Sequence, residues 1–508
     1  MQQGDSAPSQ VIIGLDVGTT AVKATAHPIG GGRAITVRRE FPLLRPAPGR
    51  EEQDPDQIVD AVLAALADLA QQLDGTPVLA ISCSAAMHGL VGLDADHRPV
   101  TPLVTWADSR STDECAALYE SSQAFDVHHL SGVPVHPMSP LTKLMWFARH
   151  DPQARVRWWV GLKDYVVWHL TGRLTSEVNS ASASGLLAMH TRQWDEGLLE
   201  LAGITADQLA DVHEITDTLP LSAAAAGRCG LPAGLPVVLG AGDGPLANIG
   251  VGALVPGVGG LTLGNSGAVR TFVDEPGVDD RGTLFCLALT PGSWVVGGPL
   301  SNGGGVISWL LDLLGFDLLT EGPDRSFSDL FELAGRVPPG SEGLVMVPYL
   351  IAERAPLWDP SLHGTLMGLQ RHHGRGHLVR AAMEGVAMQF AGITDALGQV
   401  SPVTSVHASG GAFRSAVWAH IIASVLGRPL TVVGGDGSAS LGAAALGLLA
   451  VGRATTLDEG LGLLRPGVDQ GEVVATDPQE VELYRRLRAD VPQLLEDQLQ
   501  LAAAFPRR

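Results

Sequence analysis

One segment joins a carboxylate to a glycine-containing turn in a way that suits phosphate chemistry. The segment VIIGLDVGTTAVKATAHPI (residues 11–29) is apolar enough for a buried strand, yet it carries Asp16 just before a Gly-Thr-Thr turn. Glycine lets the backbone approach a ligand and point N–H groups at phosphate oxygens, and Mg²⁺ prefers carboxylate oxygen while it keeps most of its waters. We therefore expect Asp16 to hold a Mg²⁺–water cluster, and Thr19, Thr20 and Lys23 to bind phosphates. The alternative is that Asp16 only caps a tight hairpin turn.

The same strand–turn–strand pattern recurs in the second half of the chain. LDVGTTAVKAT (residues 15–25) is echoed by LTLGNSGAVRT (residues 261–271), with Gly267 as one inserted residue. Two further Gly-rich turns follow predicted strands, SNGGGV (residues 301–306) and SGGA (residues 409–412). The echo predicts a duplicated domain, and the turns predict facing loops that grip polyphosphate. The loop residues assigned to this role are Gly264, Asn265, Ser266, Gly267, Gly304, Gly410 and Gly411.

A second carboxylate, Asp243, lies between two glycines in VVLGAGDGP (residues 237–245), just after a predicted buried strand. An aspartate in such a place is often a helix N-cap or a turn residue, and this alternative stays open. The segment begins like a dinucleotide fingerprint, but Pro245 takes the place of the third glycine, which argues against a nucleotide-reducing enzyme. The chain also lacks G-x-x-x-x-G-K-[ST], so a Walker-type phosphate loop is excluded.

A cluster of polar and aromatic residues in the first half is typical of a site for a polyol or a sugar acid. The segment AMHGLVGLD contains His88, and the segment TWADSRS contains Trp106, Asp108 and Arg110. On an extended segment these last three residues lie on one face, which offers a stacking surface, a hydroxyl acceptor and a cation. The alternatives are a structural histidine at His88 and a salt bridge at Arg110.

Mixed α/β elements must position these loops. Pro55 to Leu73 shows helical apolar spacing, and PVLAISCSAAM follows it as a strand. Later, SVHASGGAFRSAVWAHIIASVLG predicts a strand, a turn and a helix, and GSASLGAAALGLLAVG predicts a small-residue helix that packs closely. The C-terminal DPQEVELYRRLRADVPQLLEDQLQLAAAF predicts one long outer helix. With a Gly-rich hinge candidate at residues 250–260, we expect one domain over residues 10–252 and a second over residues 253–508.

The composition narrows the classes of protein and partner. At 508 residues the chain is too long for one core. Its net charge of −21 argues against nucleic acid and anionic membranes as partners, so an anionic substrate needs local donors or a metal. The four cysteines lack disulfide or metal-site spacing, and neither a signal peptide nor a membrane-spanning stretch is found. We therefore expect a cytoplasmic protein with reduced cysteines, and the oligomeric state stays open, a homodimer included.

Over nearly its whole length the sequence resembles the FGGY carbohydrate kinases. MSPLTKLMWFARH (residues 138–150) is similar to the family's first signature, and GTLMGLQRHHGRGHLVRAAME (residues 364–384) is similar to its second. Within the family, SAAMHGLVGLD, PLVTWADSRS and GVPVHPMSPLTKLMW look most like the gluconokinases. Xylulokinases are similar, but they usually carry a Gln before Met-His and an Asn after the Trp, where this chain has Ala86 and Ala107.

The resemblance implies an α/β fold with two ribonuclease-H-like domains of the actin/Hsp70 type, which close over a central cleft. It implies that residues 10–252 form the sugar-binding domain with the catalytic base and that residues 253–508 form the nucleotide-binding domain. It implies that Asp243 is the catalytic base and that Asp243 and Asp16 lie at the Mg²⁺. A further implication is a sugar pocket lined by Met87, His88, Trp106, Asp108 and Arg110. ATP is expected to contact the loop residues named above, together with Thr19, Thr20, Lys23 and Ser415.

The expected reaction is transfer of the γ-phosphoryl group of ATP to D-gluconate, which gives 6-phospho-D-gluconate. A xylulokinase, or another pentulose or polyol kinase of the family, is the alternative. A rival from another class is an actin/Hsp70-type ATPase without a sugar substrate, which would share the phosphate hairpins but not the cluster around His88 and Trp106. A sugar-sensing regulator would need a DNA-binding segment, and the net charge argues against one.

Overall fold

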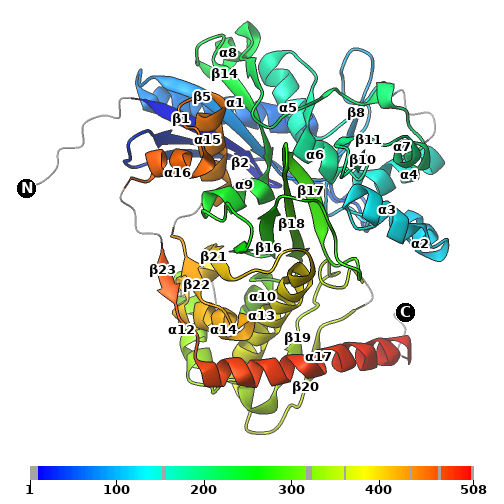
Figure 1. Cartoon of the computed structure of the whole chain (residues 1–508), viewed down its shortest axis with the longest axis vertical. Coiled ribbons are helices and arrows are strands. Elements are labelled where there is room, and N and C mark those ends of the chain that lie inside the picture. The colour runs from blue at the N-terminus through cyan, green and yellow to red at the C-terminus, as the bar shows by residue number, and fades with distance from the viewer. Residues whose placement is uncertain are drawn as a thin grey trace, which may run out of the picture.

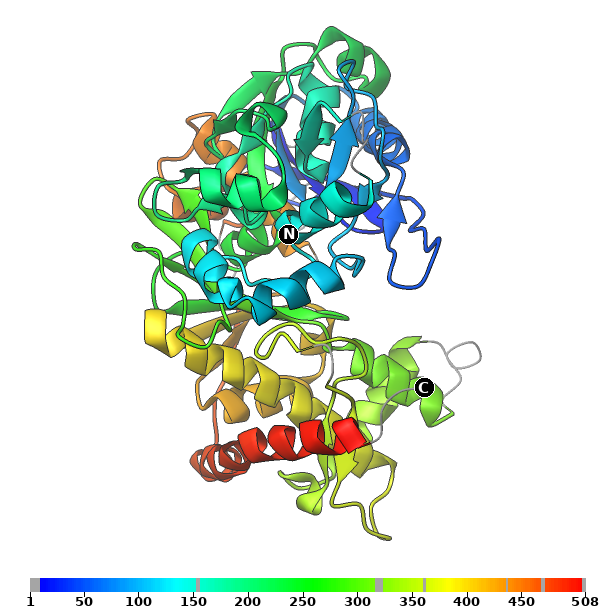
Figure 2. The same ribbon diagram turned by 90° about the vertical axis from the view of Figure 1, so that its right-hand side faces the viewer.

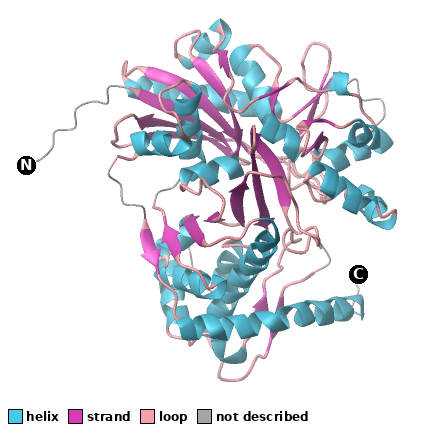
Figure 3. Cartoon of the chain, in the orientation of Figure 1, coloured by secondary structure: helices cyan, strands magenta, loops and turns pink. Residues whose placement is uncertain are grey.

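Two mixed β-sheets organise the chain. The computed structural model describes residues 10–151, 156–315, 323–359, 362–434, 437–466 and 471–504. One sheet lies in the upper part of Figure 1 and the other begins near its centre and continues below. Helices flank the strands of both sheets (Figure 3), so the fold is the predicted α/β type.

The first sheet has six strands in the order β13-β14-β5-β1-β2-β3. Strands β14, β5 and β1 are parallel, whereas β2, β3 and β13 each pair antiparallel with a neighbour. Because parallel strands end at the same edge, the segments that follow β1, β5 and β14 meet there. The strands span β1 (Val11–Val17), β2 (Ala21–Pro28), β3 (Ile35–Glu40), β5 (Val78–Ala85), β13 (Thr218–Pro220) and β14 (Pro236–Gly242).

The second sheet repeats this arrangement in seven strands, in the order β17-β18-β16-β15-β21-β22-β23. An antiparallel hairpin, β15–β16, lies beside the parallel strands β21 and β22, just as the β1–β2 hairpin lies beside β5 and β14. The pairing confirms the duplication that the sequence echo predicts. The strands span β15 (Val258–Leu263), β16 (Gly267–Val273), β17 (Phe285–Thr290), β18 (Ser293–Leu300), β21 (Ser405–Ser409), β22 (Leu430–Val432) and β23 (Glu472–Val474).

Aligned by the sequence echo, the two hairpins differ in register by two residues. Asp16 pairs with Lys23 in the first hairpin, but Thr262 pairs with Ala268 in the second, and Arg270 pairs with Gly260. Four residues separate the last cross-strand pair of the first hairpin, Val17 and Val22, whereas three separate that of the second, Leu263 and Gly267, and Arg270 lies further from its turn than Lys23 does.

Alternate side chains of β1 point to opposite faces of the sheet and pack into two different hydrophobic clusters. Val11, Ile13 and Leu15 pack into the cluster that contains the apolar face of α1 (Pro55–Leu73), whereas Ile12 packs on the other face. Helix α1 forms as predicted, because Asp54 caps its N-terminus, a proline occupies its first position and its apolar residues share one face. Asp16 lies on the same face of β1 as Ile12.

That face of the first sheet is covered by a helix from the other half of the sequence. Helix α15 (Ser438–Ala450), the predicted small-residue helix, lies against β1, β5 and α9 (Asp243–Gly250) and appears in orange beside the blue strands of Figure 1. A Cβ atom on Gly442 would lie 1.8 Å from the carbonyl oxygen of Leu246, and one on Gly250 would lie 1.9 Å from that of Ser438. The backbones of α9 and α15 are therefore in direct contact. The domain boundary at residues 252 and 253 stays a prediction.

The remaining elements surround the two sheets. Helix α17 (Pro478–Ala504) is the predicted C-terminal helix, and it lies along the outside of the lower part of the molecule against α14 (Figure 2). The other helices are α2 (Thr112–Glu120), α3 (Gln123–Ser131), α4 (Pro140–His150), α5 (Leu162–Thr171), α6 (Val178–Ala183), α7 (Glu196–Ala202), α8 (Ala223–Cys229), α10 (Gly305–Leu313), α12 (Pro323–Gly335), α13 (Arg375–Val400), α14 (Ala416–Leu426) and α16 (Leu457–Leu464). Short strands form two-stranded pairs: β4 (Glu52–Gln53) with β7 (Leu103–Val104), β6 (Val91–Leu93) with β8 (Trp158–Val160), β9 (Ser176–Glu177) with β12 (Val212–His213), β10 (Leu187–Ala188) with β11 (Gln193–Trp194), and β19 (Val345–Val347) with β20 (Thr365–Met367).

All four cysteines are buried and free, as predicted. Of the helices in the described part of the chain, none has both the length and the apolar character that a membrane span requires.

Candidate active site

The ends of three parallel strands bring four of the predicted site residues to one edge of the first sheet. Asp16 is the last but one residue of β1, Met87 and His88 follow β5, and Asp243 follows β14. Because the strands are neighbours in the order β14-β5-β1, these side chains lie close together. All four are half-buried, which leaves part of each side chain open to solvent.

Asp243 is the first residue of α9 and has the properties of a general base. The N-cap position belongs to Gly242, so the capping alternative is not realised, and Asp243 Oδ1 accepts a hydrogen bond from the N–H of Gly244 (2.8 Å). Burial, reinforced by the nearby carboxylate of Asp16, raises the pKa of Asp243 to about 6 against the opposing effect of Arg270. A carboxylate whose pKa is close to neutral pH is well suited to accept a proton from a hydroxyl group.

Asn179, which has no motif in the sequence, fixes the backbone just before Asp243. Its Oδ1 accepts a hydrogen bond from the N–H of Gly242 (3.0 Å), and its Nδ2 donates to the carbonyl oxygen of Ala288 in β17 (2.9 Å). The side chain is fully buried. Asn179 therefore ties the end of β14 to the second sheet.

Asp16 has surroundings that suit a magnesium ion. Ser84 Oγ donates a hydrogen bond to Asp16 Oδ1 (2.8 Å), and Lys23 is its cross-strand partner. Burial raises the pKa of Asp16, while Ser84 and Lys23 oppose that effect. A nearby cation favours the ionised form of two neighbouring, half-buried carboxylates such as Asp16 and Asp243. Among the described residues no group of three or more metal-ligating side chains occurs, and Mg²⁺ in kinases commonly uses only one or two carboxylates with substrate phosphates. The residues present therefore fit the ion.

The predicted phosphate loops of the second half meet one another. The N–H of Gly304 donates to the carbonyl oxygen of Gly264 (2.7 Å), and the carbonyl oxygen of Asn265 accepts from Gly303 (3.1 Å) and Gly305 (3.0 Å). At Gly410, with φ at +117°, a Cβ atom would lie 2.3 Å from the carbonyl oxygen of Leu263. Glycine is required at this close approach.

A cavity of about 520 Å³ lies between the two sheets. It confirms the predicted central cleft, because both hairpins line it. Three residues from the predicted phosphate set, Lys23, Gly264 and Gly410, belong to its wall. The other lining residues are Thr25, Thr36, Thr262, Leu263, Ser409, Gly437, Ser438 and Ser440.

The other residues predicted to contact ATP are not among the residues that line this cavity. Thr20 is exposed in the turn between β1 and β2, and a Cβ atom on Gly411 would meet open space. Ser266 and Gly267 form the end of the second hairpin turn, where the carbonyl oxygen of Ser266 accepts from the N–H of Gly264 (2.9 Å). The hydroxyl of Ser415 accepts a hydrogen bond from the N–H of Trp418 (3.3 Å) and so caps α14. The contact of these residues with ATP stays a prediction.

Trp106 and Met87, two residues of the predicted sugar pocket, contact the segments that carry Thr19 and Asp243. Trp106 Nε1 donates a hydrogen bond to Thr19 Oγ1 (3.0 Å) in the first phosphate turn. Met87 lies against Gly242, since a Cβ atom on that glycine would come 2.6 Å from its sulfur. The two side chains therefore lie beside the phosphate turn and beside Asp243, respectively.

His88 is held in an unusual backbone conformation with φ at +64°. Its Nδ1 is hydrogen-bonded to the carbonyl oxygen of Ala183 (2.9 Å), and its own carbonyl accepts from Lys143 Nζ (3.0 Å). Burial, with a contribution from the charge of Lys143, lowers the pKa of His88 to about 3. The imidazole is therefore neutral near pH 7 and can serve as a hydrogen-bonding group for hydroxyls.

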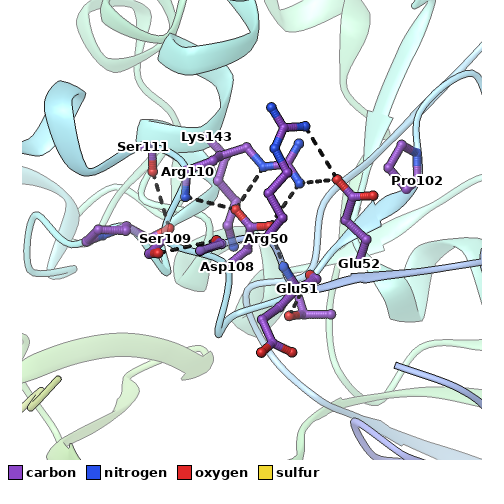
Figure 4. A network of polar contacts seen from close by, with 12 residues as sticks. Arg50, Glu51, Glu52, Pro102, Asp108, Ser109, Arg110, Ser111 and Lys143 are labelled. Carbon is purple, nitrogen blue, oxygen red and sulfur yellow. Dashed lines mark hydrogen bonds and ion pairs between the residues drawn. The ribbon is translucent and has the colours of Figure 1, made fainter. Parts of the chain in front are cut away.

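Asp108 and Arg110 form an ion pair with each other. The prediction that they lie with Trp106 on one face of an extended segment is wrong, because a turn closes there, with the N–H of Asp108 donating to Thr105 (3.2 Å). Figure 4 shows the resulting network: Arg110 donates through Nε to Asp108 (2.8 Å) and through Nη2 to Glu52 (2.5 Å). The salt-bridge alternative for Arg110 is thus realised. Their contact with a sugar stays a prediction.

Two arginines that the sequence analysis did not assign to the site lie near Asp243. The guanidinium of Arg270 lies against Gly244, and its Nη1 is buried without a hydrogen-bond partner in the part of the chain that the structure describes. The guanidinium of Arg354 lies 4.8 Å from the ring centre of Trp106. Burial lowers the pKa of both arginines to about 10. Arg270 could have been found from the sequence echo, which contains it, whereas no motif marks Arg354.

Two family models match the chain. The N-terminal domain of the FGGY family of carbohydrate kinases matches residues 11–250, and the C-terminal domain of the same family matches residues 264–451. The chain belongs to the FGGY family of carbohydrate kinases. It is therefore an ATP-using kinase that acts on a small carbohydrate, and the rival interpretation as an ATPase without a sugar substrate is excluded.

Relatives of this FGGY kinase include gluconokinases and xylulose kinases. The chain is 35% identical over 457 residues to the gluconokinase of Bacillus subtilis (strain 168), an alignment that covers 88% of this chain and 89% of the relative. The solved gluconate kinase of Lactobacillus acidophilus matches with a TM-score of 0.90 at 32% identity, over 97% of this chain and 98% of that chain. The solved xylulose kinase of the same species also matches with a TM-score of 0.90, at 31% identity, over 98% of this chain and 100% of that chain. The predicted family and fold are confirmed.

Proposed function

We propose that this FGGY kinase phosphorylates the terminal hydroxyl of D-gluconate, with ATP as the phosphoryl donor. The observation that carries the proposal is the charge of the cleft: Arg270 and Arg354 lie near Asp243, and neither forms an ion pair with a carboxylate among the described residues. In a chain with a net charge of −21, two half-buried arginines that form no ion pair among the described residues favour an anionic substrate over a neutral sugar. The similarity to a gluconokinase supports the same substrate.

In the proposed reaction, Asp243 accepts the proton of the O6 hydroxyl as O6 attacks the γ-phosphorus in line. The new O6–P bond forms while the bond between the γ-phosphorus and the bridging oxygen of ATP breaks, so ADP leaves with that electron pair. Asn179 and the N–H of Gly244 hold Asp243 in position. Lys23 and the glycine-containing loops are assigned to the phosphate oxygens, where they stabilise the developing charge.

The proposed magnesium site consists of Asp16 with Asp243 beside it. When bound, the ion supplies charge neutralisation to the phosphates. Ser84 orients the Asp16 carboxylate by its hydrogen bond, so Asp16 needs little rearrangement to face the ion or its waters.

D-Xylulose is the second candidate substrate, which the similarity to a solved xylulose kinase favours. Against it stand Ala86 and Ala107, which replace the residues usual in xylulokinases, and the two arginines near Asp243, for which a neutral ketose provides no counter-ion.

A coupled ADP-release assay over aldonates, ketoses and polyols tests the proposal. We expect kcat/KM for D-gluconate to exceed that for D-xylulose by at least about tenfold, since ~1.4 kcal/mol of transition-state discrimination gives that factor. If D-xylulose is the better substrate, the second candidate replaces the first. ADP release that does not depend on any added sugar or sugar acid would contradict both.

A further inference from the structure

Two histidines between the halves of the chain have opposite ring tautomers, and one hydrogen bond determines the tautomer of each. His88 Nδ1 lies 2.9 Å from the carbonyl oxygen of Ala183, which can only accept, so this Nδ1 carries a proton. His136 Nδ1 instead accepts a hydrogen bond from the N–H of Met138 (3.1 Å), so the proton of this ring lies on Nε2. When its ring is neutral, His88 therefore presents an acceptor at Nε2, whereas His136 presents a donor there.

One buried cation holds the backbone beside both rings. Lys143 is fully buried in α4, and its Nζ donates to the carbonyl oxygen of His88 (3.0 Å) and to that of Met138 (2.7 Å). The first bond supports the left-handed backbone of His88, with φ at +64°. The second supports the turn that starts at His136, where the N–H of Ser139 donates to the carbonyl oxygen of His136 (2.9 Å). Both rings are consequently ordered before a substrate binds, which lowers the entropic cost of binding.

Both rings are uncharged near neutral pH, and each keeps one unused hydrogen-bonding atom. Burial, to which the charges of Lys143 and Arg354 add, lowers the pKa of His88 and of His136 to about 3. A neutral imidazole has one donor and one acceptor, and Nδ1 of each ring is already bonded within the protein. In the described part of the chain, Nε2 of neither ring has a hydrogen-bond partner. Both side chains are half-buried, so these Nε2 atoms are suited to a ligand.

The two rings lie near the proposed base. The ring of His136 lies edge-on to that of Trp358 in the second half of the chain, with 5.3 Å between the ring centres. His136 is therefore at the boundary between the two halves. The guanidinium of Arg354 lies close enough to His88, His136 and Asp243 for its charge to act on all three. A small molecule whose hydroxyl contacts Asp243 is consequently within reach of both rings.

From this arrangement we propose that His136 and His88 bind hydroxyls along the carbon chain of the aldonate, His136 as a donor and His88 as an acceptor. The inference rests on the proposed function and adds His136, a residue without a predicted role, to the substrate-binding residues. A hydroxyl group both donates and accepts, so it can satisfy either Nε2 atom. A substrate that lacks the contacted hydroxyl leaves a half-buried Nε2 atom unpaired, and the pair therefore selects a polyhydroxylated chain.

Two amide substitutions of His136 separate substrate binding from support of the turn. In H136N the amide oxygen can replace Nδ1 as the acceptor for Met138, but the donor of Nε2 is lost. In H136Q the amide nitrogen can replace that donor, but the acceptor for Met138 is lost. The assay is ADP release by the full-length protein with D-gluconate. Since one neutral hydrogen bond is lost, we expect kcat/KM to fall roughly 3- to 10-fold in H136N and to stay within about twofold in H136Q.

Monodeoxy analogues of D-gluconate test whether the lost bond is made to the substrate. Each analogue lacks one hydroxyl between the carboxylate and the carbon that is phosphorylated, and kcat/KM is measured with the unmodified enzyme, H136N and H88N. Asparagine tolerates the positive φ of His88, and its amide can donate to Ala183, so H88N removes only the acceptor. For each variant the losses from the substitution and from one particular missing hydroxyl should not add, because both remove the same bond. The matched control is H190N at the exposed His190, which should change no value.

The outcomes separate this inference from the proposed function. If D-gluconate is phosphorylated but H136Q is the weaker of the two His136 variants, or if the losses add for every analogue, the proposed function stands and the histidine pair is refuted. If the unmodified enzyme does not phosphorylate D-gluconate, the proposed function fails and the inference fails with it. Thermal unfolding of each variant shows whether it is folded, and if H136N is not, the analogue series with H88N decides.

Discussion

Replacing Asp243 by Asn tests the proposed base most directly. Asn keeps the shape of the side chain, and its Oδ1 can still accept the hydrogen bond from the N–H of Gly244 that Asp243 accepts at 2.8 Å. It cannot accept the substrate proton, however. General-base catalysis contributes about 10²–10⁴-fold, which corresponds to about 3–5 kcal/mol of transition-state stabilisation. We therefore expect kcat to fall by that factor while D-gluconate and MgATP bind with nearly unchanged affinity.

The same substitution should make the protein more stable. The pKa of Asp243 lies at about 6, against an ordinary value of 3.8, and one pKa unit corresponds to about 1.4 kcal/mol. Since the folded pKa is raised, the ionised carboxylate destabilises the folded state fully above pH 6 and not at all below about pH 4. Removing the charge should add up to about 3 kcal/mol to the free energy of unfolding at pH 7.5, measured without nucleotide or divalent cations.

Steady-state kinetics, binding calorimetry and urea unfolding on the same preparation check all three expectations. The exposed residue Asp280 provides the control, because Asp280→Asn should change neither rate nor stability. If Asp243→Asn keeps more than about a tenth of kcat, well short of the expected loss, the base is another group. If it instead loses stability or substrate affinity, Asp243 has a structural role and the reasoning fails.

Two further predictions concern carboxylates at and near the site. Asp16→Ala should fold, lose most activity and need more Mg²⁺ for half its maximal rate; an unchanged Mg²⁺ dependence in the folded variant would return Asp16 to a role in the turn. Burial raises the pKa of Asp164 to about 6, from an ordinary 3.8, so its ionisation should cost the folded state about 3 kcal/mol as pH rises from about 4 to 6. Asp164→Asn should therefore gain stability over the unmodified protein across that interval, and urea midpoints that stay parallel between the two proteins would contradict this.

Signals contained within a single segment of the sequence were sufficient to predict the helices and strands named above. The bounds of α1 agree with the prediction because its cap, Asp54, its first-turn proline and its apolar spacing are all contained in the segment itself. The hairpin turns and the strands before Asp16 and Asp243 were predicted for the same reason, since a turn and the strand before it are neighbours in the sequence. That Asp16 and Asp243 lie close together was implied only by the family resemblance.

Contacts between distant segments could not be predicted in this way. Arg110 was expected to face a sugar, but its partner Glu52 lies 58 residues earlier, and nothing in the spacing of either segment indicates the pair. Asn179 donates a hydrogen bond to Ala288 in a distant strand. Arg354 lies over the ring of Trp106, which belongs to the other half of the chain. The cleft therefore contains residues whose chemistry depends on tertiary structure, and only the structure identifies them.

The position of α15 has a consequence for how the protein is made. The first sheet is complete in its strands once β14 has been synthesised, yet the helix that covers the Ile12 face of β1 begins only at Ser438. At ~5–20 residues per second, a ribosome needs roughly 10–40 s to add the intervening segment. During that time an apolar surface meant for α15 stays uncovered and open to association with other nascent chains or chaperones. The N-terminal half alone should accordingly be poorly soluble, and a separate peptide containing α15 should restore its solubility when the two are produced together.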